Sequence, residues 1–393
     1  MTHDQEMRDL LRETAAPLTT LTTADLVLLG RRSERHRRFA LTGMAAAGVG
    51  LALVGATALV GPHSADNHRA TGTPTSSPAT PPTQGTADCT VQALTLPSGV
   101  TSADAYAIDP SGHQIVGVGW RNKAVLWRDG TPTLLPSVAA QDDTGVMVGG
   151  VNARGVVVGS TAPTASSVHA WVYRNGKVTV LPAPRGHARV MAKAVNTAGD
   201  IAGLAFDDSD NYVAVVWPAN APGTVKVLTA PPGRYGAAAY GIGDDGTVVG
   251  DLEDGGHPFV WDGAGRGRVA AERPGRPGGR IFAISGDWAV GWVSGDTGPN
   301  PVAARWNLRT GTMTTFDLTG TARAVAADGT FLASEVPSSN TLLVGPDGTV
   351  RQLPNLASPG MIDAVAISAD GKTLAGQIRY GGSQPDVPVV WHC

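Results

Sequence analysis

The sequence predicts an all-β protein in which small sheets repeat along the chain. Gly (51) and Pro (28) are abundant among the 393 residues, and charged residues make up only 16%. From residue 89 onward, short apolar segments alternate with turn sequences. Tryptophans recur there at 44–46-residue intervals, at positions 127, 171, 217, 261 and 306. Many short strands joined by tight turns account for this composition, whereas a helical protein does not.

The N-terminal region predicts a membrane anchor. Residues 1–38 are polar, and residues 39–61 contain no charged side chain over 23 positions. A helix of that length spans the roughly 30 Å hydrocarbon core. The basic run Arg31-Arg32-Ser33-Glu34-Arg35-His36-Arg37-Arg38 directly precedes it, so we expect 1–38 to be a cytoplasmic tail. The predicted topology is a single-pass signal-anchor in the cell membrane, with the C-terminal domain outside.

A cleaved export signal is the alternative for this segment. Arg37-Arg38 followed by Phe39-Ala40-Leu41 partly matches a twin-arginine signal, and Ala56-Thr57-Ala58 has the small residues of a cleavage site. The 38-residue leader is long for a signal peptide, which favours the uncleaved anchor.

Residues 62–88 predict a disordered linker. They contain five Pro, six Thr and three Ser and lack apolar periodicity, so they cannot bury enough surface to fold. In a polyproline II conformation the 27 residues reach roughly 80 Å.

Residues 89–393 contain seven copies of one repeat. Each copy begins with Ala or Gly followed by Ile or Val, has a Gly (Ala in the sixth copy) at the end of a short apolar strand, and continues to an apolar run that ends in Trp in six copies. The sixth copy has Val344 at that position. The seven starting steps are at 107–108, 150–151, 194–195, 241–242, 283–284, 324–325 and 366–367. A period in the forties with four strands per unit predicts a seven-bladed β-propeller. The repeated tryptophans are interpreted as packing between blades.

The last copy lacks a fourth strand, and an extra strand at 90–97 precedes the first copy. The Leu-Thr-Leu-Pro ending of this strand matches other fourth strands, so we expect it to complete the last blade and close the ring. The only two cysteines, Cys89 and Cys393, then lie at the same hairpin and predict a disulfide. An extracellular location would supply the oxidising conditions that such a bond requires.

The residue pattern of the repeats resembles that of the HAF-type extracellular repeats of bacteria. Val151-Asn152, Val158-Gly159 and His169-Ala170-Trp171 are the best match, and His257-Pro258-Phe259-Val260-Trp261 is another. The resemblance covers residues 89–393. It implies a propeller and an extracellular location, and it implies no reaction.

Loops between the second and third strands of each copy vary in length and chemistry, so we expect ligand binding there. Their ranges are 118–123, 160–168, 204–213, 251–257, 292–302, 334–340 and 377–386. Candidate ligand-binding residues in these loops are Trp120, Arg121, Tyr212, His257, Trp292, Arg379 and Tyr380. Rim packing is the alternative role for the two tryptophans.

No cofactor or metal is expected. The acidic loop Asp207-Asp208-Ser209-Asp210-Asn211 lacks the Gly and terminal Glu of an EF-hand, which favours a solvated loop over a Ca²⁺ site. Acids in the tight turns, such as Asp245 and Asp370, are interpreted as structural.

Two functions remain open. The first is a binding or scaffolding module that engages protein or cell-wall glycan at the cell surface. The alternative is an extracellular carbohydrate-active hydrolase or lyase, although the common catalytic motifs are absent. Two or more carboxylates, or a histidine, converging on the variable-loop face would favour the enzyme. The net charge of −3 and the lack of a basic stripe argue against nucleic acid as a partner.

Overall fold

The computed structural model describes residues 85–136, 145–164, 167–234, 236–252, 256–295, 300–336, 338–381 and 384–393. The predicted cytoplasmic tail, the predicted membrane helix at 39–61 and residues 62–84 of the predicted linker lie outside these ranges. Among the residues that the structure describes, no helix has the length and hydropathy needed to cross a membrane.

The described chain is all-β and contains repeated four-stranded antiparallel sheets, as predicted. Four of them use consecutive strands. The first contains β3 (Ala103–Ile108), β4 (Gln114–Gly119), β5 (Lys123–Arg128) and β6 (Thr131–Leu134). The second contains β7 (Gly145–Val151), β8 (Val157–Thr164), β9 (Ser167–Arg174) and β10 (Lys177–Val180). The third contains β11 (Arg189–Val195), β12 (Ile201–Phe206), β13 (Tyr212–Trp217) and β14 (Lys226–Val227). The fourth contains β15 (Ala237–Ile242), β16 (Val248–Leu252), β17 (His257–Trp261) and β18 (Gly267–Val269).

An eight-stranded sheet follows, in which the long strand β22 (Thr312–Val325) belongs to two four-stranded units. Its first half pairs with β21 and its second half, from Gly320, pairs with β23. The first unit also contains β19 (Gly279–Ser285), β20 (Trp288–Ser294) and β21 (Pro301–Asn307). The second unit also contains β23 (Phe331–Glu335), β24 (Thr341–Val344) and β25 (Val350–Gln352), with the two-residue β1 (Gly85–Thr86) added in parallel to β25.

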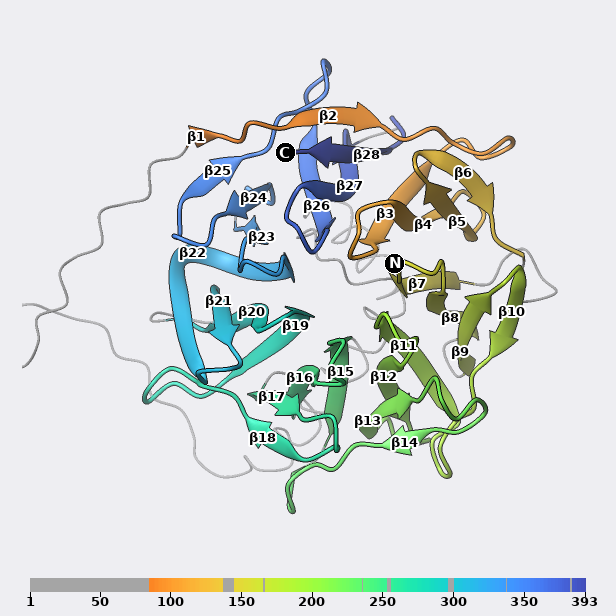
Figure 1. Ribbon diagram of the computed structural model, residues 1–393, viewed down its shortest axis with the longest axis vertical. Coiled ribbons are helices and arrows are strands. Elements are labelled where there is room, and N and C mark those ends of the chain that lie inside the picture. Colours follow the sequence, from red (N-terminus) through yellow and green to blue (C-terminus); the bar gives the residue numbers. More distant parts are fainter. Residues whose placement is uncertain are drawn as a thin grey trace, which may run out of the picture. The chain divides into compact units, whose positions relative to one another are not determined.

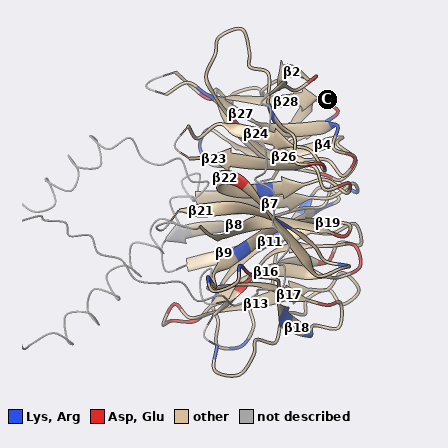
Figure 2. Cartoon of the chain, turned by 90° about the vertical axis from the view of Figure 1, so that its left-hand side faces the viewer, with Lys and Arg blue, Asp and Glu red and all other residues tan. Residues whose placement is uncertain are grey.

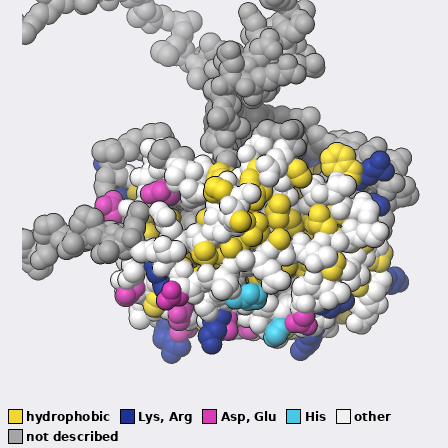
Figure 3. All heavy atoms as spheres, turned by 90° about the horizontal axis from the view of Figure 1, so that it is seen from above, with side chains coloured by type: hydrophobic (Ala, Val, Ile, Leu, Met, Phe, Trp, Pro, Cys, Tyr) yellow, Lys and Arg dark blue, Asp and Glu magenta, His cyan; other side chains and the backbone are white. Residues whose placement is uncertain are grey.

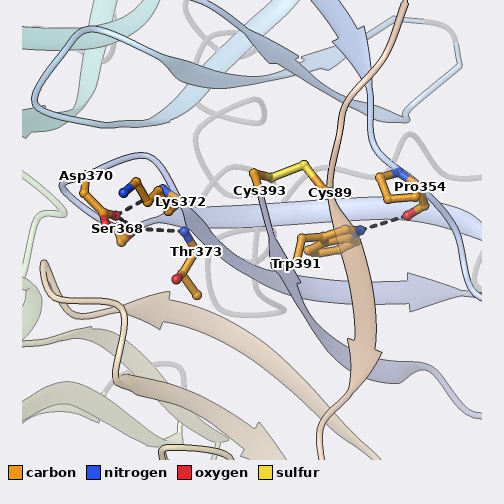
Figure 4. Close-up of a disulfide and its surroundings, with 8 residues drawn as sticks. All are labelled: Cys89, Pro354, Ser368, Asp370, Lys372, Thr373, Trp391 and Cys393. Atoms are coloured by element: carbon orange, nitrogen blue, oxygen red, sulfur yellow. Dashed lines mark hydrogen bonds between the residues drawn. A yellow bond between two sulfur atoms is a disulfide. The ribbon is translucent and has the colours of Figure 1, made fainter.

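The last sheet combines the two ends of the described chain. It contains β26 (Met361–Ile367), β27 (Thr373–Arg379) and β28 (Val387–His392), and β2 (Thr90–Ala93) is its outermost strand. The predicted disulfide is confirmed: Cys89 and Cys393 are bonded, 304 residues apart in sequence, beside the β2–β28 pair (Figure 4).

In Figure 1 these sheets surround a common axis, with β3, β7, β11, β15, β19, the end of β22 and β26 innermost. The arrangement is consistent with a β-propeller. Apolar clusters join each sheet to its neighbour, so both faces of the innermost strands are covered. This burial is the main source of stability, because one such sheet cannot cover its own faces.

The repeated tryptophans pack between the sheets, as the sequence predicts. All six are at most 3% exposed. Five of them donate an indole N–H to a carbonyl oxygen beyond the outermost strand of the preceding sheet, as Trp391 does to Pro354 at 2.8 Å (Figure 4). Val344, at the equivalent position of the remaining unit, is also fully buried. The tryptophans are therefore structural.

The turns between first and second strands also connect neighbouring sheets. The Asn152 side chain donates to the Asn196 carbonyl at 2.9 Å, and the Asn196 side chain donates to the Gly243 carbonyl at 3.1 Å. Asp245 and Asp370 accept hydrogen bonds from backbone N–H groups inside their own turns. These polar side chains therefore hold the turns in place, in agreement with the structural interpretation of the acids.

The surface has no strongly charged side in the views shown. Acidic and basic residues are interspersed in the loops at both ends of the strands (Figure 2). Seen from above, hydrophobic side chains gather over the middle of the surface and charged side chains lie mainly toward its lower edge (Figure 3). The outer strand β2 runs along this side in Figure 1.

Candidate binding site on the innermost strands

Each of the seven four-stranded units has a β-bulge on its innermost strand. The pairing with the second strand skips one residue, as between Ala105 and Ala107 in β3 or between Ala322 and Ala324 in β22. The seven skipped residues are Tyr106, Gly149, Lys193, Tyr240, Phe282, Arg323 and Val365. A bulge redirects a side chain from the regular alternation of a strand.

A second-strand glycine accompanies the bulge in six of the seven units. A Cβ atom on Gly203 would lie 1.9 Å from the carbonyl oxygen of Met191, two residues before the skipped Lys193. The equivalent distances at Gly117, Gly159, Gly250, Gly291 and Gly376 are 1.8–2.2 Å. Only glycine permits this close approach of two backbones. The unit that begins at Gly320 has Ala333 at this place; there Gly320 itself makes the close approach, to the Ser334 carbonyl.

The skipped residues differ in chemistry and are all partly exposed, whereas most of their immediate neighbours are buried. Because adjacent sheets cover both faces of an innermost strand, a side chain in its middle can reach solvent only along the axis of the ring. The skipped residues of neighbouring strands also contact each other, as the Tyr240 and Phe282 rings do at 5.7 Å. This is the repeat position at which the sequence varies without disturbing the packing between sheets.

The most polar part of this ring is a cluster that we call the inner-strand site. It consists of Asp104 and Tyr106 of β3, Arg323 of β22, Asp363 of β26, Gln377 and Arg379 of β27, and Asp386 just before β28. Arg379 donates to Asp363 from Nε at 2.9 Å and from Nη2 at 2.8 Å, and its Nη1 lies 3.0 Å from Asp386. Both nitrogens donate to the same oxygen of Asp363, Oδ2, so Arg379 links β26 to Asp386 across the second-to-third strand loop.

Two members of the site have weaker partners. The guanidinium of Arg323, whose side chain is 14% exposed, approaches Asp363 only to 3.9 Å. The Asp104 carboxylate accepts one hydrogen bond, from the Tyr106 hydroxyl at 3.2 Å. Both belong to innermost strands and are partly exposed.

The pKa values of the site reflect burial. Burial raises the pKa of Asp104, and the nearby Arg379 only partly opposes this effect. Burial and the adjacent Asp104 raise the pKa of Tyr106, so its phenol remains protonated. Burial lowers the pKa of Arg323. Burial opposes the charged form of Arg379 as well, but Asp363, Asp104 and Asp386 outweigh it and raise its pKa.

The seven candidate residues from the sequence do not form one site, because they lie on five different sheets. Arg379 is in the inner-strand site, and Tyr380 follows it and packs against the hydrophobic core of the same sheet. Trp120 is 58% exposed and Arg121 follows it with a positive φ, in the tight turn between β4 and β5. Trp292 of β20 is partly buried opposite Arg280.

Tyr212 and His257 have local structural contacts. Tyr212 is 7% exposed and packs against Phe206 with ring centroids 5.8 Å apart. His257 lies between Glu272, 2.9 Å from Nδ1, and Arg234, 2.9 Å from Nε2. This arrangement connects the start of β17 with the segment that leads to the next sheet.

The acidic loop at 207–211 uses its carboxylates internally. Asp207 accepts hydrogen bonds from the Asn211 side chain and from the backbone N–H groups of Asn211 and Ser209, and these bonds lower its pKa. Asp210 pairs with Arg189 at 2.7 Å. In the described part of the chain, no group of three or more His, Cys, Asp or Glu side chains is placed to hold a metal ion.

Four residues of the site, Asp104, Tyr106, Arg323 and Asp363, were not predicted because they lie in first strands, whereas variable chemistry was expected only in loops; Gln377 opens the predicted loop 377–386 but was not among the candidate residues. A signal for the skipped position was present. In most copies a small residue, one variable residue and Ala or Gly precede the Ile or Val step, as in Ala105-Tyr106-Ala107-Ile108 or Ala322-Arg323-Ala324-Val325.

The comparisons with known proteins find a similarity in fold and none in sequence family. No protein-family model matches the chain, and no curated protein matches it in sequence. The fold is similar to that of virginiamycin B lyase from Staphylococcus aureus, with a TM-score of 0.51, 14% identity, and coverage of 78% of this chain and 100% of that chain.

Two further structures give similar values. A catalytically inactive variant of the same enzyme with quinupristin has a TM-score of 0.51 at 15% identity and the same coverage. The match to Ycf48 bound to a D1 peptide covers 79% of this chain and 97% of the Ycf48 chain, at 12% identity and a TM-score of 0.48. This chain is thus similar to β-propeller proteins in its fold.

Proposed function

We propose that the chain is a seven-bladed β-propeller, tethered outside the membrane by one N-terminal helix, and that it binds protein or cell-wall glycan. The seven four-stranded units and the pairing of β2 with β28 support seven blades closed by the N-terminal strand. The Cys89–Cys393 disulfide supports an oxidising compartment outside the membrane. The apolar segment 39–61 and the preceding arginines support the tether.

The inner-strand site carries the binding proposal. A propeller that served only as a spacer has no need for partly exposed Asp, Tyr and Arg side chains on its innermost strands. Arg323 and Asp104, with their weak internal partners, are available to a ligand that enters along the axis. Polar groups on a rigid scaffold are typical of a recognition site.

The alternative function, a carbohydrate-active enzyme, is favoured by one observation. Asp104, Asp363 and Asp386 converge around Arg379 on the variable-loop face, and the raised pKa of Asp104 suits a general acid. Ion pairs with Arg379 occupy Asp363 and Asp386, which leaves one carboxyl group where glycosidases need two. Binding therefore remains the first proposal.

Retention of the detergent-solubilised full chain on purified cell-wall sacculi, together with crosslinking to membrane proteins in cells, tests this function. We expect Arg323→Ala to reduce capture. Arg309→Ala, which removes a surface ion pair to Asp287, is the matched control and should leave capture unchanged. Binding to neither sacculi nor protein would refute the proposal, and turnover of cell-wall glycan would replace it with the enzyme.

The topology is tested separately by protease treatment of intact cells. An outward-facing propeller predicts that residues 89–393 are digested or released while residues 1–38 are protected. Protection of the C-terminal domain would contradict the proposed orientation.

A further inference from the structure

Lys193 is a lysine on an innermost strand whose ammonium group has no partner. It is the skipped residue of β11, between Ala192 and Ala194. The four residues that precede it in the strand are buried, whereas Lys193 itself is partly exposed. In the described part of the chain, no hydrogen bond or ion pair involves its ammonium group. Lys193 therefore presents a positive charge that no acid of the fold compensates.

The other three basic residues of the innermost strands each face an acid. Arg189, at the start of β11, pairs with Asp210 at 2.7 Å. Arg280 of β19 pairs at 2.7 Å with Asp251, which directly follows the second-strand glycine of the preceding sheet. Arg323 of β22 faces an acid of β26, although at a longer distance of 3.9 Å. The lysine of β11 is the exception among them.

Two aromatic side chains follow Lys193 around the axis. Tyr240 and Phe282 are the skipped residues of β15 and β19, the next two innermost strands in the ring (Figure 1). Their rings meet edge to face, with centroids 5.7 Å apart, and both residues are partly exposed. Aromatic side chains offer a large apolar contact area to a ligand. The unpaired lysine is thus followed by an apolar surface at the same repeat position.

Skipped residues of neighbouring innermost strands lie against each other. On one side of Lys193, a Cβ atom on Gly149 would lie 2.9 Å from the Lys193 Cα atom. On the other side, β11 contacts β15 as β15 contacts β19, where the rings of Tyr240 and Phe282 meet. The equivalence of the repeat positions therefore places Tyr240 beside Lys193. Gly149 adds no side chain to this part of the ring.

We infer that Lys193, Tyr240 and Phe282 bind the C-terminal residue of a peptide, with its carboxylate on the Lys193 ammonium group and its apolar side chain on the two rings. A carboxylate supplies one negative charge and accepts hydrogen bonds from the lysine N–H donors. A C-terminal residue carries the charge and the apolar side chain on one Cα atom, as neighbouring positions of the ring require. This inference rests on the proposed binding function and specifies its ligand.

The neighbouring skipped residues favour a peptide end over an acidic sugar. A sugar unit carries several hydroxyl groups, and each one that leaves water needs a new hydrogen-bond partner. Gly149, Phe282 and Val365 have no side-chain group that forms hydrogen bonds. An apolar C-terminal residue needs polar partners only for its backbone groups. Its side chain is matched by the aromatic pair.

Binding of the peptide acetyl-Ala-Ala-Phe to the full chain in detergent, measured by calorimetry and saturation-transfer NMR, tests the inference. The C-terminal amide of this peptide, which lacks the charge, should bind at least about tenfold more weakly, the effect of losing one charge-assisted hydrogen bond. Acetyl-Ala-Ala-Ala, which lacks the ring, should also bind more weakly. Lys193→Gln should weaken binding of the acid by about tenfold or more and leave binding of the amide unchanged.

Two further variants serve as controls. Lys193→Arg keeps the charge and should retain binding of the acid. Lys226→Gln is the matched control, because Lys226 is an exposed lysine on β14, the outermost strand of the same sheet; it should bind the acid like the wild type. Circular dichroism verifies that each variant is folded.

Three results would overturn the inference: equal binding of the acid and the amide by the wild type, equal binding of the acid by the wild type and Lys193→Gln, or binding of methyl glucuronide without binding of the peptide. The last result would assign the site to an acidic sugar. Capture on sacculi and by crosslinking is measured on the same preparation. Its persistence without peptide binding would remove the inference and leave the proposed function standing, and loss of both would remove both.

Discussion

Two junctions between neighbouring sheets use the same repeat positions in opposite ways. Between β16 and β19, Asp251 and Arg280 form an ion pair, and the Arg280 guanidinium also lies 5.0 Å from the Tyr240 ring centroid and 5.7 Å from that of Phe282. Between β27 and β3, the equivalent positions hold Gln377 and Asp104. The first junction pairs a negative side chain with a positive one, and we call it the matched junction. The second has an amide and a carboxylate at the same positions, and we call it the unmatched junction. The comparison teaches that the same repeat positions can form an ion pair at one junction and hold an amide and a carboxylate at another.

The test with the largest expected effect on stability removes the ion pair at the matched junction. Arg280→Met keeps the aliphatic stem but leaves the fully buried Asp251 without the guanidinium. Removing one partner of a buried ion pair costs about 3–5 kcal/mol, because the remaining charge stays desolvated. We expect the free energy of unfolding in urea to fall by that amount. A loss below about 1 kcal/mol would mean that the pair contributes as little as a surface pair.

The second test loosens the sheet at the unmatched junction in which β2 pairs with β28. Replacing Cys89 and Cys393 with Ser frees the strand that precedes β3. Chain-entropy models assign long-loop disulfides about 4–5 kcal/mol, and measured values are typically about 2–4 kcal/mol. We expect thermal unfolding of the double variant to match that of the reduced wild type. A variant as stable as the oxidised protein would show that pairing of β2 with β28 suffices for closure.

The third test removes the ionisable carboxyl group at the unmatched junction. Asp104→Asn keeps the shape of the side chain but replaces a partly buried carboxylate, and we expect about 1 kcal/mol of added stability at neutral pH. Because the native pKa of Asp104 is raised above 3.8, the folded wild type retains a proton that the unfolded chain has lost. The contribution of Asp104 to wild-type stability therefore falls as the pH rises through its native pKa.

The advantage of Asp104→Asn over wild type should grow accordingly as the pH rises above about 4. Urea unfolding of both proteins across this range checks the sign, since pH effects shared by the two chains cancel in the difference. A difference that stays constant with pH would contradict the raised pKa.

The smallest effect is expected on the surface. Asp287 and Arg309 form an ion pair at 2.6 Å with exposed side chains (44% and 76%). Asp287→Asn should change the free energy of unfolding by less than about 1 kcal/mol, and added salt should reduce even that effect. A larger change would show that this face contributes to stability as the matched junction does.

The features that recur with the period of the repeat could be predicted from the sequence alone. Trp391 and Val344 stand at equivalent positions, and the two cysteines fall where the last copy lacks a strand. These predictions needed only counting and the burial rule for large apolar side chains.

The inner-strand site could not be predicted in the same way. Its chemistry depends on a bulge, which pairing registers reveal and hydrophobic patterns do not. Asp104 lies in an apolar segment and looks like an isolated polar residue within a strand. Its importance arises from Arg379, more than 270 residues away in sequence, which comes near only because β3 packs against β27.

The short strand β1 has a mechanical consequence. It pairs in parallel with β25 of one sheet, and the buried Ala87 then leads to Cys89 at the edge of the next. A pull on the chain before Gly85 first loads the hydrogen bonds between β1 and β25, and then a covalent bond to the last residue. The force therefore passes from Cys89 to Cys393 instead of separating β2 from β28. We therefore expect the β1–β25 pair to break first under load, while the disulfide keeps β2 attached to β28.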